Sequence, residues 1–459
     1  MLTEEIADYI INTKYENLTQ DDINHIKKCF IDYLAVTNKG LKETPTQIAL
    51  KTLKQLNSNN KIQKTSIIGY KEKNYLNEID TGFINGISAH VLDLDDGHKL
   101  GQIHPGSIVF STALALSQKY DLNSKEFIES IIVGYDTAIN LGKLVNPNHR
   151  NKGFHTSGTI GTLAAGATAT KLLKLNKKQI IATLGLCGTQ SAGLLESNHT
   201  GSMGKVLHIG KAIQNGILST YLAKNNFTGA KSIIEGNEGI INAMAYKISN
   251  EKIKTFQNDL NKHHINEIYH KKYPFCRHLH SSIDSAIELN KYIIKNQIKF
   301  NQIKKINIRT YKIAAEHNNF KPKNTQELKQ SLPLAVAITI NKGNPNLKLI
   351  ETLIKNNLLK YSTKSEIHQI LEKINIIEDP ELNKLFPNER PSNIEIETTK
   401  EEKTNFKTKI PIGEKENPLT KEDIIKKFKE LNPNYDIDKL KIINTMEEYK
   451  INTIINQIN

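Results

Sequence analysis

The stretch that decides the fold of this chain is Gly158-Thr159-Ile160-Gly161-Thr162-Leu163-Ala164-Ala165-Gly166-Ala167. It predicts a helix whose small side chains let neighbouring helices approach closely. Of the 25 glycines, 14 fall within residues 151–250 and only 2 follow residue 250. After residue 250 the composition turns to Lys, Asn, Ile and Glu. We therefore expect tightly packed helices first, a domain boundary near residue 260, and a different architecture beyond it.

Helix starts recur along the first 250 residues. Each pairs a cap residue with apolar residues at helical spacing, as in Thr19-Gln20-Asp21-Asp22, Asn123-Ser124-Lys125-Glu126 and Asn176-Lys177-Lys178-Gln179. Strand-like alternation is scarce in this part of the chain. The N-terminal part is therefore predicted to be an all-helical domain built from many antiparallel helices.

The later part of the chain mixes strand and helix signals. Apolar residues alternate with polar ones around Ile306 and Ile308, and again around Ile394 and Ile396, which predicts strands. Ser281 is expected to cap a helix between them. The tail from Thr420 is helical again and could rejoin the first domain, which would leave a mixed α+β domain as an insertion.

Bulk composition indicates a globular protein with more than one domain. A chain of 459 residues exceeds one ordinary core, and its 38% hydrophobic and 24% charged content is typical of globular proteins. Three cysteines without metal-ligand spacing fit a reducing compartment. No apolar run approaches the roughly 20 residues that span a bilayer, and acids follow the N-terminus closely. We expect a cytoplasmic protein that does not engage a membrane.

The net charge of +14 raises the question of a polyanionic partner. Residues 150–250 hold 11 Lys or Arg against 3 acids, a net charge of +8. The basic residues are scattered, and few aromatics accompany them for base stacking. A nucleic-acid partner is therefore not expected, although salt-dependent retention of DNA or RNA would test it. A small polyanionic substrate would be attracted by the same field.

Short segments carry ionisable groups beside turn residues, as a pocket for a small polyanion requires. The segments are Asp93-Leu94-Asp95-Asp96, His104-Pro105-Gly106, Gly153-Phe154-His155-Thr156, Met203-Gly204-Lys205-Val206-Leu207-His208 and Tyr273-Pro274-Phe275-Cys276-Arg277-His278-Leu279-His280. Taken singly, each has a structural explanation, such as a hydrated turn, a capping histidine or a plain helix entry. Together they suggest proton transfer beside a carboxylate.

Cofactor and metal motifs are missing from these segments. Lys205 lacks the spacing of a phosphate-binding loop, and the dinucleotide fingerprint is absent. The acids from Asp93 to Asp96 lack the longer array of oxygen ligands that a calcium loop needs. We therefore predict no cofactor and no metal.

The segments occur in an order that resembles the MmgE/PrpD family over nearly the whole chain. The resemblance rests on Asn85-Gly86, Ala89-His90, Asp93-Leu94-Asp95-Asp96, His104-Pro105-Gly106, Gly134-Tyr135-Asp136, Gly153-Phe154-His155-Thr156, Lys205-Val206-Leu207-His208-Ile209-Gly210, Phe227-Thr228-Gly229, Glu235-Gly236, Tyr273-Pro274, Cys276, His280, Ile283-Asp284 and Asn417-Pro418-Leu419-Thr420.

The resemblance implies a mainly α fold. A large helical domain would comprise residues 1–260 and 410–459, with a smaller α+β lid at 261–409. It also implies a homodimer, and site residues at Asp93, His104, His155, Lys205 and His280.

Two departures concern the substrate. The chain has Ser331-Leu332-Pro333-Leu334 where the family often has Ser-x-x-Tyr, and Tyr311 is only near the position of a site tyrosine.

The expected function is a lyase acting on a small di- or tricarboxylate. Lys205, His208 and Arg277 are assigned to the substrate carboxylates, and His104, oriented by Asp93, to proton transfer. His155 and His280 are candidates for the opposite acid or base. Dehydration of a tricarboxylate such as 2-methylcitrate is the first expectation. Decarboxylation of cis-aconitate and epimerisation of iminodisuccinate are the alternatives within the same fold. Outside enzymes, a helical scaffold protein would be indifferent to replacement of His104 or Lys205.

Overall fold

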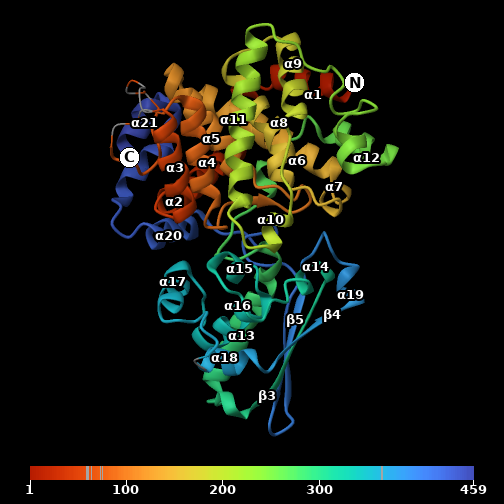
Figure 1. The fold of residues 1–459 in the computed structure, drawn as a ribbon, viewed down its shortest axis with the longest axis vertical. Helices are drawn as coiled ribbons and strands as arrows, with labels where there is room; N and C mark the ends of the chain where they lie inside the picture. Colours follow the sequence, from red (N-terminus) through yellow and green to blue (C-terminus); the bar gives the residue numbers. More distant parts are fainter. Residues whose placement is uncertain (58–60, 62, 64, 73, 75, 363–364) are drawn as a thin grey trace. The chain divides into compact units, whose positions relative to one another are not determined.

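A computed structural model describes residues 1–57, 61, 63, 65–72, 74, 76–362 and 365–459 (Figure 1). The chain forms two compact units. We call the first the helical unit, made of residues 1–197, 203–269 and 420–459, and the second the α+β unit, made of residues 198–202 and 270–419. The prediction of a mainly α fold with a smaller α+β part is confirmed. The predicted division at 260 and 410 differs by about ten residues from these limits.

The described part of the helical unit is built mostly from α-helices that pack against one another. They are α1 (Leu2–Asn12), α2 (Gln20–Gly40), α3 (Thr44–Leu56), α4 (Glu78–His90), α5 (Pro105–Tyr120), α6 (Ser124–Val145), α7 (Asn148–Asn151), α8 (Thr156–Leu172), α9 (Lys177–Thr189), α11 (Gly204–Lys224), α12 (Asn250–Asp259), α20 (Lys421–Leu431) and α21 (Ile451–Ile458). The short helix α10 (Glu196–His199) contains the point where the chain first passes between units.

Local capping explains where several of these helices begin. The side chains of Thr19, Asn123 and Asn176 each accept a hydrogen bond from the backbone N–H three residues on. The side chain of that third residue in turn accepts from the backbone N–H of the cap residue. These are the capping boxes that the sequence predicts, and each satisfies backbone donors that the first helical turn leaves unpaired. The three helix starts are therefore confirmed.

Helix α8, the glycine-rich stretch, is buried on every face and packs against α5, α6, α9 and α11. A methyl group added at Gly161 would lie 2.5 Å from Ile108 Cδ1, and one added at Gly166 would lie 2.6 Å from Cys187 Sγ. Both distances are below van der Waals contact, so a larger residue would push the neighbouring helices apart. The small residues therefore permit the central position of α8.

The C-terminal tail returns to the helical unit. Helix α20 packs along α2, where Lys427 Nζ lies 2.6 Å from Asp32 Oδ1 and Asn432 donates to the carbonyl of Ala35. The predictions that the tail from Thr420 is helical and rejoins the first domain are thus confirmed.

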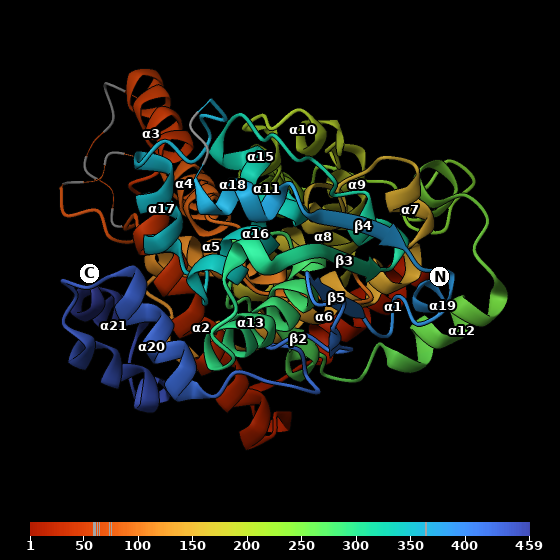
Figure 2. The same ribbon diagram turned by 90° about the horizontal axis from the view of Figure 1, so that it is seen from below.

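The α+β unit contains a four-stranded sheet in the order β4-β3-β5-β6. Strands β3 and β4 are parallel, whereas β3/β5 and β5/β6 are antiparallel. Helices α13 and α16 pack against each other and against strands of this sheet (Figure 2). The elements are α13 (His280–Lys295), β3 (Ile303–Thr310), α14 (Lys312–Ala315), α15 (Thr325–Lys329), α16 (Leu332–Lys342), α17 (Leu347–Lys355), α18 (Glu366–Leu371), β4 (Ile374–Glu378), α19 (Pro380–Asn383), β5 (Ser392–Thr398) and β6 (Lys403–Thr408).

The strand predictions around Ile306 and Ile394 are confirmed by β3 and β5, whose isoleucines are buried. The predicted cap at Ser281 is wrong. A 3₁₀ turn at Arg277–Leu279 leads directly into α13, which begins at His280 without a side-chain cap. Ser281 lies inside the helix because the preceding turn already supplies helical backbone.

Among the described residues, no helix combines the length and the apolar character needed to cross a bilayer.

Candidate active site

The candidate site begins in the loop that follows α4. Asp93 has a left-handed backbone (φ 55°), a conformation that aspartate tolerates better than most residues. The turn places Asp93, Asp95 and Asp96 in buried positions, and their carboxylates take different partners. Burying several acids together is costly unless hydrogen bonds or cations compensate. The partners of each acid therefore define the chemistry of the loop.

His104 is the N-cap residue of α5, and Pro105 begins the helix. The imidazole Nδ1 lies 2.7 Å from the carbonyl oxygen of Asp96, so Nδ1 carries the proton and donates it. Its backbone N–H donates to Ser157 Oγ at 3.0 Å. In the neutral ring Nε2 then holds the lone pair, which makes it the nitrogen that can accept a proton.

Asp96 is held by two donors. Tyr135 donates its hydroxyl to one carboxylate oxygen at 2.6 Å, and the backbone N–H of Gly106 donates to the other at 2.9 Å. Burial raises the pKa of Asp96 to about 7, although the bond from Tyr135 acts in the opposite direction. Asp96 therefore changes its charge near neutral pH and shapes the backbone that positions His104.

Asp95 joins two histidines. Its Oδ2 accepts from Ser107 Oγ at 2.6 Å, lies 2.7 Å from His90 Nδ1 and lies 3.5 Å from His104 Nδ1. The rings of His90 and His104 are 4.8 Å apart, and the ring of His155 is 6.2 Å from that of His90. One carboxylate therefore lies between two imidazoles at the base of the site.

Lys205 pairs with Asp93. Its Nζ lies 3.0 Å from Asp93 Oδ2, and the two side chains are 19% and 7% exposed. Lys205 occupies the first turn of α11, where the unpaired N–H groups already carry partial positive charge. A lysine is unfavourable there for the stability of the helix. A role in binding an anion at this helix end would explain why a lysine stands there.

His155 and His208 form a second imidazole pair. Their Nδ1 atoms lie 3.0 Å apart, so one ring donates and the other accepts. Burial, followed by the charges of His90 and Lys205, holds the pKa of His155 well below its usual range, and burial also lowers the pKa of His208. Both rings are therefore neutral at physiological pH. Gly153, with φ of 89°, allows the turn that delivers His155 to the start of α8.

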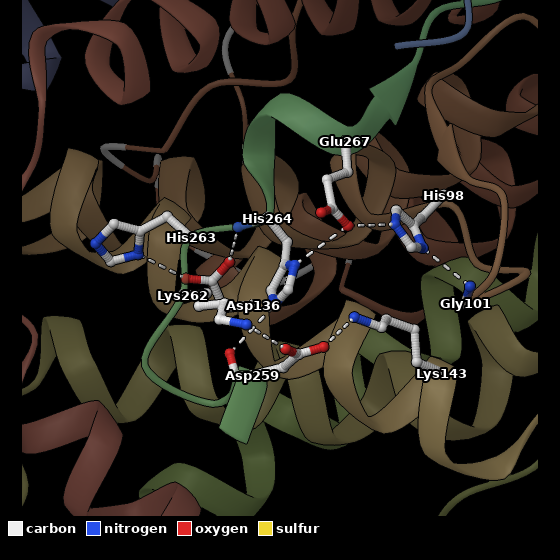
Figure 3. Close-up of polar contacts among 9 residues, drawn as sticks. All are labelled: His98, Gly101, Asp136, Lys143, Asp259, Lys262, His263, His264 and Glu267. Atoms are coloured by element: carbon white, nitrogen blue, oxygen red, sulfur yellow. Dashed lines mark hydrogen bonds and ion pairs between the residues drawn. The ribbon is translucent and has the colours of Figure 1, made fainter. Parts of the chain in front are cut away.

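A polar network supports the loop between the acids and His104 (Figure 3). His98 accepts the backbone N–H of Gly101 at Nδ1 (2.9 Å) and donates from Nε2 to Glu267 (3.2 Å). His264 donates to the same carboxylate oxygen at 3.2 Å. These bonds, first from His264 and then from His98, hold the pKa of Glu267 far below its usual range. Strands β1 (Gly97–His98) and β2 (Ile268–Tyr269) pair beside this network.

The same network continues along the segment that carries Glu267 (Figure 3). Asp136 accepts from His263 Nδ1 at 3.0 Å and from the backbone of His264 at 2.8 Å. Asp259 lies 2.7 Å from Lys143 and 2.9 Å from Lys262. The chain from Asp259 to Glu267 is therefore tied to α6 and to the loop that precedes His104.

Arg277 and His280 lie in the α+β unit, in a buried ionic cluster. Arg277 donates twice to Glu414, once to His280 Nδ1 and to two backbone carbonyls, which engages all five of its N–H groups. Arg390 donates to Glu414 at 2.8 Å. His280 donates from Nε2 to the carbonyl of Phe275 at 3.1 Å. A substrate carboxylate on Arg277 would have to replace one of these acceptors, so that role stays a prediction.

One group of donors has spacing that a cation could use. Donor atoms of His90, Asp95 and His104 lie within 4.8 Å of one another. However, the Nδ1 atoms of both histidines face oxygen acceptors at hydrogen-bond distance, so a cation bound through Nδ1 would have to displace their protons. We interpret the group as hydrogen-bonded. The predicted absence of a metal and of a cofactor stays a prediction.

The structure thus brings Asp93, His104, His155, Lys205 and His208 together within the helical unit. Sequence reasoning named His90, Asp95 and Tyr135 only within its quoted motifs and gave them no role of their own. It missed Ser107, and it missed Glu414 and Arg390 beside Arg277. A histidine at a helix end five residues before an acid was the available signal for His90. No local signal indicates which groups Tyr135 and Glu414 contact, because their partners are distant in sequence.

The chain combines an N-terminal helical domain with a smaller C-terminal α+β domain. Family models describe the same two parts: the MmgE/PrpD N-terminal domain matches residues 4–251, and the MmgE/PrpD C-terminal domain matches residues 273–448. The protein therefore belongs to the MmgE/PrpD family.

Similar proteins include the cis-aconitate decarboxylases of mouse and human, each 22% identical over 438 residues. These alignments cover 93% of this chain and 86% and 87% of the two relatives. A cis-aconitate decarboxylase from Aspergillus terreus is 25% identical over 244 residues, 52% of this chain and 49% of that protein. The chain thus spans about half the length of the fungal relatives it matches.

Proposed function

We propose that this protein is a lyase that moves a proton beside a carboxylate of a small di- or tricarboxylate. The observation that carries the proposal is the tautomer of His104. Because its Nδ1 donates to the carbonyl of Asp96, Nε2 is the basic nitrogen, and it belongs to the same group of side chains as the Lys205 ammonium. A base beside a fixed cation is what removal of a proton next to a carboxylate requires.

The division of labour follows from the charges. Lys205, positioned by Asp93, is the cation that binds a substrate carboxylate and stabilises the negative charge that develops when the neighbouring carbon loses its proton. His104 accepts that proton at Nε2. The neutral pair of His155 and His208 offers one N–H group, on Nε2 of whichever ring accepts between the two Nδ1 atoms, that can donate to the substrate without adding a further positive charge.

The finer choice of substrate draws on the relatives. The proteins from mouse, human and Aspergillus terreus are named cis-aconitate decarboxylases, which favours cis-aconitate as the first substrate to test. We therefore propose decarboxylation of cis-aconitate ahead of the dehydration of 2-methylcitrate that the sequence first suggested. Both reactions develop negative charge beside a carboxylate, which Lys205 would stabilise. They differ in the direction of proton transfer. Loss of water needs neutral His104 to accept a proton at Nε2, whereas loss of carbon dioxide leaves a carbanion that protonated His104 would supply with a proton from the same nitrogen.

The test is proton NMR of the purified protein in deuterated buffer with cis-aconitate, 2-methylcitrate and iminodisuccinate supplied separately. Deuterium incorporation identifies the carbon whose proton is exchanged, and new signals separate decarboxylation, dehydration and inversion. His104→Gln should abolish both exchange and product. His149→Gln is a matched control, because His149 is a buried histidine of the helical unit that contacts Thr159. No exchange with any acid would refute the proposed function.

We also propose that the protein is a homodimer, as the family resemblance implies. Light scattering coupled to size-exclusion chromatography would give a mass near twice 51.8 kDa for a dimer. A monomeric mass at micromolar concentration would refute this part of the proposal.

A further inference from the structure

His90 is a buried histidine in the candidate site to which the proposed mechanism assigns no role. It ends helix α4 and is 1% exposed. Its Nδ1 lies 2.7 Å from Asp95 Oδ2, which requires a proton on Nδ1. Its Nε2 has no hydrogen-bond partner among the described residues. A buried polar atom without a partner is rare in folded proteins and calls for an explanation.

The unpaired Nε2 gives His90 an unusual freedom. When the ring is neutral, the lone pair on Nε2 is buried and unused. When the ring takes a second proton, Nε2 receives it without breaking the bond to Asp95. His90 is the last residue of α4, and its Nδ1 contacts the Asp95 carboxylate. His90 can therefore hold or release a proton without any rearrangement of the backbone.

The surroundings of His90 oppose a second positive charge nearby. The ring of His104 is 4.8 Å away and that of His155 is 6.2 Å away, and His90 contributes to the lowered pKa of both His155 and His208. The titratable and charged groups that surround this centre from the packed elements are Asp32 of α2, Asp93, Asp95 and Asp96 of the loop, His104 at the start of α5, His155 at the start of α8, and Lys205 and His208 of α11.

We propose that His90 is a positioning residue that shares the Asp95 carboxylate with His104 and so decides which of the two imidazoles carries the proton used in catalysis. Asp95 Oδ2 is 2.7 Å from one Nδ1 and 3.5 Å from the other. The single negative charge of Asp95 can compensate one positively charged imidazole but not two. Two charged rings would also repel each other. While His90 holds the proton, His104 stays neutral and can act as a base.

This inference rests on the proposed function for its catalytic meaning, but the proton sharing can be measured without turnover. The experiment is a pH titration of the imidazole nitrogens by NMR in protein labelled with ¹⁵N-histidine. His90→Asn and His104→Gln assign the two rings. Asparagine at position 90 retains an N–H donor for Asp95 but cannot carry a proton charge. His149→Asn is the matched control, since burial lowers the pKa of His149 to about 4 and leaves it neutral.

In the wild type, the two rings should titrate together, each curve showing two steps. In His90→Asn, His104 should titrate in one step, shifted upward by about one to two pH units, because the competing charge at about 5 Å is gone. His149→Asn should leave the titration of His104 unchanged. A titration of His104 that is the same in His90→Asn as in the wild type would overturn the proposal. An equal upward shift of His104 in the control variant His149→Asn would overturn it as well.

Turnover supplies the second readout. If the protein converts cis-aconitate or another acid, the acidic limb of kcat/KM should move upward by the same one to two units in His90→Asn, while kcat at high pH stays within a few fold of the wild type. An unchanged acidic limb would contradict the inference. If no acid is converted, the proposed function fails, and the NMR titration still decides whether His90 and His104 share a proton.

Discussion

The ion pair between Lys205 and Asp93 offers the sharpest test of the candidate site. We expect Lys205→Met to lower kcat/KM for the substrate by about 10²–10³-fold, the usual effect of removing one group that stabilises developing negative charge. Methionine preserves most of the volume and the apolar stem of lysine but removes the charge. Both kcat and KM should change, because the ammonium group would bind the carboxylate in the ground state and stabilise it further in the transition state.

The effect of Lys205→Met on stability can be bounded from the same contacts. Breaking a buried ion pair costs about 3–5 kcal/mol, because the remaining buried charge loses its compensating charge. Here the lysine side chain is 19% exposed, so water can reach Asp93 and reduce that cost. Removing a cation from the first turn of α11 also returns roughly 0.3–1 kcal/mol. The free energy of unfolding should therefore fall by about 1–3 kcal/mol, which leaves the variant folded.

Lys143→Met is the matched control for this prediction. Lys143 and Asp259 lie 2.7 Å apart and are 20% and 16% exposed, close to the values for Lys205 and Asp93. Asp259 keeps its contact with Lys262, so the control should lose at most about 1 kcal/mol and no activity. The assay compares initial rates and thermal unfolding of both variants. Turnover by Lys205→Met at the level of Lys143→Met would refute the role of Lys205.

Three further predictions follow from the polar contacts of the helical unit. Glu267→Gln should lower the free energy of unfolding by about 1–2 kcal/mol at pH 7. Because the pKa of Glu267 is lower in the folded than in the unfolded protein, the wild type should lose this advantage as the pH falls below about 4.5. Calorimetry across that range tests this, and a difference between the two proteins that does not change with pH would contradict it. Tyr135→Phe should destabilise the protein by about 1.5–3 kcal/mol at pH 8. The loss should be smaller at pH 5, where Asp96, with a pKa of about 7, is protonated and the hydrogen bond from the Tyr135 hydroxyl stabilises it less. Equal losses in thermal unfolding at both pH values would show that Asp96 does not titrate between them. Dialysis against a chelator should leave both turnover and melting temperature unchanged, and recovery of lost activity on adding a divalent cation would contradict the hydrogen-bonded interpretation of His90, Asp95 and His104.

The sequence by itself determined the features that depend on neighbours in the chain. Capping at Thr19, Asn123 and Asn176 needs a residue only three positions away, so the pattern predicts it directly. The strands around Ile306 and Ile394 follow from alternation over a few residues. The run of small residues around Gly161 predicted a helix with close neighbours, and α8 is that helix.

The local signal was insufficient where a preceding turn changed the backbone. Ser281 has the composition of a helix cap, but the 3₁₀ turn at Arg277–Leu279 starts the helical path earlier. In the same way, Arg277 was assigned to a substrate because arginine binds carboxylates well. The structure shows a carboxylate already there, supplied by Glu414, which is 137 residues away in the chain. Only tertiary structure identifies such a partner.

Tertiary structure also decided how the site is charged. The sequence identified Asp93, His104, His155, Lys205 and His208 as ionisable groups beside turns, and folding brings them together from α11, the loop after α4 and the starts of α5 and α8. Which nitrogen of each ring holds the proton depends on hydrogen bonds between these distant segments and on burial, both of which arise only when the helices pack. The sequence determined the chemical groups present, and packing decided their partners and their protonation.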